Sequence, residues 1–213
     1  ECFTLNWDET AVKTKIKAVA GSILQVYGHG PDILLLEEVE GLRILNRLND
    51  EGLGASAGYK TVVWLRGHDR RGIAVGLMSR FPLAGEPRLH DLIRQGSTKP
   101  KETRGILEVP LKLPTGQIFT VFGVHLPSQF NPVGERQQAI SQLRSLVQTM
   151  PPDALWMIGG DWNITAREDR DWGLIENQMR EVGLVSHQIG CRNCVGTHFY
   201  KGVWNFFDIL VFS

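Results

Sequence analysis

Polar side chains end or interrupt five apolar stretches of this sequence. Asn6 follows CFTL, Glu37 and Glu38 follow DILLL, His125 follows IFTVFGV, Asp161 and Asn163 follow LWMIGG, and Asp208 lies between WNFF and ILVF. Burying any one of these groups without a partner would be costly, so we expect them to meet in one pocket. Such a pocket would hold carboxylates, amide groups and an imidazole together.

Oxygen donors of this kind suit Mg²⁺ or Mn²⁺ rather than zinc. Mg²⁺ usually takes one or two carboxylates and leaves its other positions to water and phosphate oxygens. The set therefore points to hydrolysis of a phosphate ester.

Each residue also has a plainer interpretation. Asn6 could be a turn residue, the two glutamates could cap a helix, and His125 could be a hydrogen-bonded core histidine. Asp161 and Asn163 could form an Asx turn. The whole set in this order is more specific than any of its members.

The elements that must position these side chains follow from apolar spacing. Helices are predicted over 10–27, 42–48, 132–147 and 172–182. Strands are predicted over 2–7, 32–39, 59–65, 73–79, 105–113, 117–126, 154–162 and 204–212, and PTG at 114–116 predicts a hairpin. Because strands outnumber helices, two sheets with helices outside fit better than one doubly wound sheet.

Composition sets wider limits. The 213 residues are 42% hydrophobic and carry 23 basic and 23 acidic side chains, so charge gives no support for a broad grip on nucleic acid. No apolar run reaches the ~20 residues of a membrane helix, so we expect no transmembrane segment. We expect a monomer.

The CRNC motif has several interpretations. Cys191 and Cys194 could close a small surface disulfide, which we favour, could stay as free thiols, or could bind zinc or do redox chemistry. His187 and His198 flank the motif, as zinc ligands would have to. A disulfide would favour a secreted or periplasmic location, and free thiols a cytoplasmic one.

Taken in order, these motifs resemble the endonuclease/exonuclease/phosphatase family, with the DNase I-like fold. The matching pieces are LNW at 5–7, LLLEEVEG at 34–41, GIAVGLMSRFPL at 72–83, TRGILEV at 103–109, GVHLPS at 123–128, GGDWN at 159–163 and FFDILV at 206–211. The resemblance spans nearly the whole chain, so we expect one domain over 1–213. It implies an α/β four-layer sandwich of two packed mixed sheets with helices on the outer faces.

The resemblance also implies roles. Glu38 would be the principal Mg²⁺ carboxylate, with Asn6 beside it in the metal and phosphate site. Asp161 would orient or deprotonate the attacking water, and Asn163 would position the phosphate. The other implied residues are His125 at the phosphate or leaving group, Arg104 on the phosphate charge, and Asp208 holding a second histidine.

Two features depart from the family pattern. Glu37 stands where many relatives have Gln, which adds a carboxylate near the metal. The Ser-Asp-His segment that carries the second histidine does not occur in these residues. The resemblance therefore implies one further strand with such a segment after Ser213.

We expect a metal-dependent phosphoesterase, by default a nuclease-like phosphodiesterase that takes a phosphate ester and could take nucleic acid. A lipid or inositol-phosphate phosphoesterase of the same fold is the alternative, and a non-catalytic binding module is another. No apolar hairpin for a membrane stands out in the sequence. The loop 65–72 could contact phosphate or could be a solvated turn.

Overall fold

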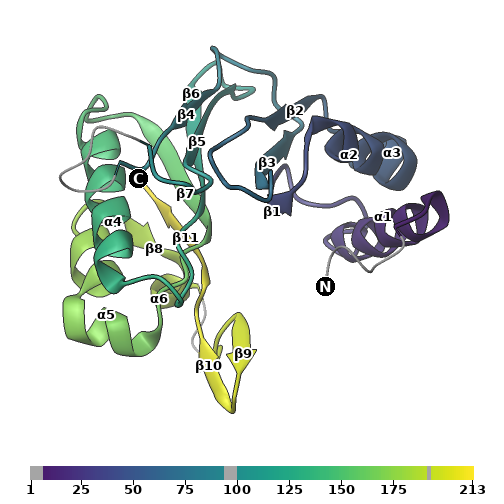
Figure 1. Ribbon diagram of the computed structural model, residues 1–213. Coiled ribbons are helices and arrows are strands. Elements are labelled where there is room, and N and C mark those ends of the chain that lie inside the picture. The colour runs from purple at the N-terminus through teal and green to yellow at the C-terminus, as the bar shows by residue number, and fades with distance from the viewer. Residues whose placement is uncertain (1–6, 94–99, 191–192) are drawn as a thin grey trace.

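The architecture comes from a computed structural model, which describes residues 7–93, 100–190 and 193–213. The helical segments on one side of the sheets are α1 (Glu9–Leu24), α2 (Leu42–Arg47), the π-helical η1 (Leu48–Leu53) and α3 (Gly54–Ala57). Those on the other side are α4 (Val133–Gln148), α5 (Ala166–Trp172), the π-helical η2 (Leu174–Met179) and α6 (Ser186–Ile189). The sheets lie between these two groups (Figure 1).

The smaller sheet has the order β1-β3-β2, with β1 (Ile33–Val39), β2 (Thr61–Trp64) and β3 (Ala74–Ser79) all antiparallel. The larger sheet has the order β4-β5-β6-β7-β11-β8. Its strands are β4 (Arg88–His90), β5 (Ile106–Lys112), β6 (Ile118–His125), β7 (Leu155–Asp161), β8 (Leu184–Val185) and β11 (Asp208–Phe212). Only the β6–β7 pair is parallel within this described sheet, so the sheet is mixed.

Three apolar clusters hold the layers together. The cluster between the sheets joins Val75 and Leu77 of β3 to Val109 of β5 and Val121 of β6. A second cluster packs the α1 side onto the smaller sheet, and a third packs α4 and η2 onto the larger one. Four layers result, which confirms the expected fold class.

Most of the predicted elements are present. The strand predicted over 2–7 lies largely outside the described residues. The helix predicted over 172–182 is instead α5, which begins at Ala166, followed by the turn at Gly173 and η2. The strand predicted over 204–212 is divided at Phe206 and Phe207 into β10 (Val203–Asn205) and β11.

The expectation that no apolar hairpin stands out was wrong. β9 (His198–Tyr200) pairs with β10 and projects from the body of the molecule (Figure 1). Phe199, Tyr200, Val203 and Trp204 on it are 45–61% exposed. Apolar alternation over only three residues per strand is too short to be distinguished from a loop in the sequence.

Across the described residues, no helix has both the length and the apolar character that crossing a membrane requires.

Candidate active site

The strand register of the larger sheet places three polar residues in one row. Asp161 is the Cα partner of His125 across the parallel β6–β7 pair and of Asp208 across the antiparallel β7–β11 pair. Directly paired residues point to the same face of a sheet. The three polar residues predicted at separate strand ends therefore lie side by side.

The two glycines before Asp161 allow this row to form. Gly160 has φ +133°, and a Cβ on it would lie 2.0 Å from the Val124 carbonyl oxygen. A Cβ on Gly159 would lie 2.8 Å from Leu210 and 2.9 Å from Leu35. Any side chain at these positions would push β7 away from β6 and from the facing sheet.

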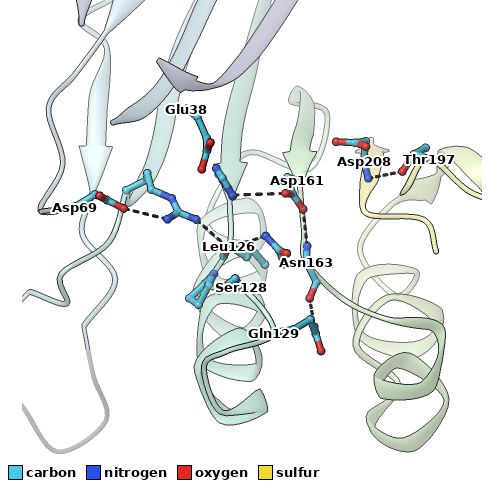
Figure 2. A network of polar contacts seen from close by, with 12 residues as sticks. Glu38, Asp69, Leu126, Ser128, Gln129, Asp161, Asn163, Thr197 and Asp208 are labelled. Atoms are coloured by element: carbon cyan, nitrogen blue, oxygen red, sulfur yellow. Dashed lines mark hydrogen bonds and ion pairs between the residues drawn. The ribbon is translucent and has the colours of Figure 1, made fainter. Parts of the chain in front are cut away.

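Asn163 does not reach the site by strand alternation, because β7 ends at Asp161. Asn163 takes a left-handed conformation with φ +50°, which asparagine tolerates better than most residues. Its backbone N–H then donates to Asp161 Oδ1 at 2.9 Å, which is the Asx-type contact considered above. The Asx turn and the shared polar site, which the sequence left as alternatives for Asp161 and Asn163, therefore occur together (Figure 2).

The main-chain oxygen of Leu126 orients two of these side chains. It accepts a hydrogen bond from Asn163 Nδ2 and one from Arg104 Nη2, both at 3.2 Å. Arg104 Nη1 donates to Asp69 Oδ2 at 3.0 Å (Figure 2). Arg104 is 7% exposed and both of its terminal nitrogens are bonded, so its positive charge reaches the site from a fixed, buried position.

Glu38 reaches the site from the smaller sheet. The pairing of β1 with β3 shifts register between Leu36 and Val39, and Glu38 in this bulge has φ +56°. Left-handed backbone at a glutamate is unfavourable, and such conformations gather at functional sites. The Glu38 side chain is exposed and lies 3.3 Å from Arg71 Nη1.

Two neighbouring carboxyls have raised pKa values. Burial, together with the charges of Asp208 and Asp161, raises the pKa of Glu37 to about 7. Burial and the charge of Asp208 raise the pKa of Asp161 to about 6, against the lowering effect of the Asn163 N–H. Glu37 and Asp208 both line a cavity of about 600 Å³ between the sheets.

His125 is neutral at physiological pH. Burial, with Arg104 and Arg71 close by, lowers its pKa to about 4. Its Nε2 lies 3.5 Å from Asp161 Oδ2, so this is a long contact of a neutral ring and not an ion pair. The Nδ1 atom is buried without a hydrogen-bond partner in the described structure.

A divalent cation fits the chemistry of this edge. Within the described residues, no three His, Cys, Asp or Glu side chains enclose a metal by themselves. Mg²⁺ does not need such a cage, because one or two carboxylates and several waters suffice. Glu38 offers an accessible carboxylate, and a cation beside it would favour the ionised forms of Glu37 and Asp161, whose pKa values are raised by burial and by neighbouring carboxylates.

Asn6 and Cys191 lie outside the described residues, so the structure does not place them. Cys194 is disulfide-bonded, and its pairing with Cys191 stays a prediction. The sequence suggested that the loop 65–72 could contact phosphate, but it assigned no role to Asp69 or to Arg71, which contacts Glu38 from this loop. It also missed Gln129, whose side chain donates to the Asn163 carbonyl.

The two-sheet α/β sandwich with helices on its outer faces has the DNase I-like fold, and the row of polar residues lies at the edge of its larger sheet. The sequence matches the Endonuclease/Exonuclease/phosphatase family over residues 3–213, and the chain belongs to that family. Membership supports phosphate-ester hydrolysis as the reaction class.

Solved structures with the same fold include truncated Caenorhabditis elegans TDP2, at 18% identity and TM-score 0.62, covering 97% of this chain and 79% of that one. A Staphylococcus aureus beta toxin lacking its beta hairpin matches at 14% and 0.66, covering 99% and 81%. D. rerio TDP2 complexed with a single-strand DNA product matches at 20% and 0.60, covering 96% and 78%. No curated protein matches the sequence.

Proposed function

We propose that this protein is a Mg²⁺- or Mn²⁺-dependent phosphodiesterase that uses water as the attacking nucleophile. The observation that carries the proposal is the row His125–Asp161–Asp208, faced by Glu38 from the other sheet. Acid, base and metal-binding groups are thereby brought to one edge from four strands.

The environment of each residue suits it to a different role in the reaction. Asp161, with a pKa of about 6, is mostly ionised at neutral pH and can take a proton from the attacking water. His125 is neutral and donates a hydrogen bond from its ring N–H to a phosphoryl oxygen. Asn163 presents its amide, and Arg104 contributes positive charge from its buried position.

Glu38, with Asn6 as the predicted second donor, would hold the cation. A bound Mg²⁺ supplies Lewis acidity to the phosphoryl group. Asp208 is a positioning residue in this scheme, because its charge acts on Asp161 and Glu37.

The test is hydrolysis of a bis-aryl phosphodiester after chelation and after Mg²⁺ or Mn²⁺ is restored. Metal should restore turnover, Glu38→Ala should abolish that response, and Asp161→Asn should lower turnover by about 10² to 10⁴. Glu40→Ala is the matched control, because Glu40 is an exposed glutamate two residues away. Full metal-dependent turnover in Glu38→Ala would show that the site is wrongly assigned.

Nucleic acid is the first substrate to compare, because a neighbour in fold holds a single-strand DNA product. The exposed aromatic side chains of the β9–β10 hairpin favour a second candidate, a lipid phosphodiester at a membrane surface. Single-stranded DNA and sphingomyelin vesicles, assayed side by side, separate the two. Loss of vesicle hydrolysis alone in Trp204→Ala would support the lipid.

A further inference from the structure

Arg71 contacts the Glu38 carboxylate, which is the group that the proposed metal would need. Its Nη1 lies 3.3 Å from Glu38 Oε1, and the two side chains are 59% and 57% exposed. Both residues sit at the mouth of the site, one on the loop before β3 and the other in the β1 bulge.

Arg71 is held in this position by Asp69. The Asp69 Oδ1 atom accepts from the Arg71 backbone N–H at 2.9 Å and from Nε at 3.2 Å, and Oδ2 accepts from Nη2 at 3.2 Å. Asp69 is itself 8% exposed in its side chain and bonded to the buried Arg104 at 3.0 Å. Asp69 therefore holds one edge of the guanidinium through Nε and Nη2, and Nη1 is the nitrogen turned to Glu38.

A divalent cation on the same Glu38 oxygens would meet the guanidinium at close range. Two like charges a few ångströms apart repel, and near a protein surface that repulsion is stronger than in bulk water. The carboxylate cannot serve both partners at full strength. Metal binding therefore competes with the Arg71–Glu38 contact, while the contacts with Asp69 can persist.

We propose that Arg71 is a built-in counter-cation of Glu38, which the divalent cation displaces and which thereby sets the metal affinity of the site. This inference rests on the proposed metal dependence. The displaced Nη1 remains at the mouth of the site, where a phosphoryl oxygen of the substrate would arrive.

The experiment titrates Mn²⁺ into chelator-stripped protein and follows free Mn²⁺ by electron paramagnetic resonance. Arg71→Ala should bind Mn²⁺ roughly two- to fivefold more tightly, the range expected for removing one exposed ion pair. Arg71→Lys keeps the charge and should stay close to the original affinity. Arg71→Gln is a second neutral variant and should also bind Mn²⁺ more tightly than the original protein. It provides the test if Arg71→Ala fails to fold.

Arg70→Ala is the matched control. Arg70 is the adjacent arginine, is 81% exposed and pairs with Glu102 at 2.6 Å, away from Glu38. Its substitution should leave Mn²⁺ affinity unchanged.

The outcomes separate the two proposals. Absence of Mn²⁺ binding in the original protein, or equal binding after Glu38→Ala, refutes the proposed metal site itself. Binding that depends on Glu38 but is the same in Arg71→Ala, Arg71→Gln and Arg70→Ala refutes the role of Arg71 alone.

Discussion

Asp69 is the carboxylate whose ionised form the fold stabilises most clearly. Burial alone would raise its pKa, but hydrogen bonds from Arg71 and Arg104 outweigh burial and hold the pKa at about 2, below the unfolded value of 3.8. A lowered pKa gives stability that is present above pH 3.8 and is lost as the pH falls through about 2. The shift corresponds to about 2 kcal/mol.

Asp69→Asn should therefore lower the free energy of unfolding by about 2 kcal/mol at pH 6. The gap between the two proteins should close between pH 4 and pH 2, because Asp69 becomes protonated in the original protein. Urea denaturation at several pH values measures this gap. A gap that stays constant over that range would contradict the assigned pKa.

At the scale of elements, the β9–β10 hairpin differs from the rest of the structure. Its base is fastened, because Thr197 Oγ1 accepts from the backbone N–H groups of Phe207 at 3.0 Å and Asp208 at 2.9 Å. Beyond this base, Phe199 and Trp204 pack on each other, with ring centroids 5.0 Å apart. The hairpin is thus tied to Asp208 but adds little buried area.

Trp204→Ala should cost less than about 1 kcal/mol of stability, as expected for an exposed side chain. Trp162→Ala is the contrasting change, because Trp162 is 0% exposed and its Nε1 donates to the Ile209 carbonyl at 2.9 Å. It should cost about 3 to 5 kcal/mol. Chemical denaturation of both variants tests this, and similar losses would mean that the hairpin is packed in solution.

Prediction from sequence succeeded where an apolar run was long. The apolar run in β1 and the hairpin of β5 and β6 were recognised, as were the polar residues Glu38 of β1 and His125 of β6. The loop 65–72 was considered only as a possible phosphate contact, and no role was assigned to Asp69 or Arg71 in it, because their contacts with Arg104 and Glu38 depend on the fold. The left-handed conformations of Glu38 and Asn163 were also beyond the sequence, since they depend on a bulge and on a contact with Leu126.

At the scale of the whole molecule, the site depends on how the two sheets pack. Glu38 belongs to the smaller sheet, whereas His125 and Asp161 belong to the larger one. The apolar cluster between the sheets therefore sets the distance across the site. Leu77 lies in that cluster and is 0% exposed.

Leu77→Ala should cost about 2 to 5 kcal/mol and should also lower kcat roughly ten- to hundredfold, since small displacements of catalytic groups are expensive. Ile140→Ala is the control, because Ile140 is also 0% exposed but belongs to α4 and packs in the cluster between α4 and the larger sheet. It should lose similar stability with a much smaller change in kcat. Unfolding free energies and kcat, measured where both variants are folded, provide the comparison; equal kcat losses would contradict the assigned role of the inter-sheet cluster.

The carbonyl oxygen of Leu126 belongs to the main chain, so no substitution at that position removes it. A saturation scan would record Leu126 as a packing residue, tolerant of other apolar side chains, although its oxygen aligns Arg104 and Asn163. Deleting or inserting one residue directly after His125 would move that oxygen and misalign both partners. The chain length directly after His125 is therefore constrained by the position of the Leu126 oxygen. Replacing the peptide bond by an ester, or changing the length of the chain here, would reveal the role of that oxygen, whereas an amino-acid scan cannot.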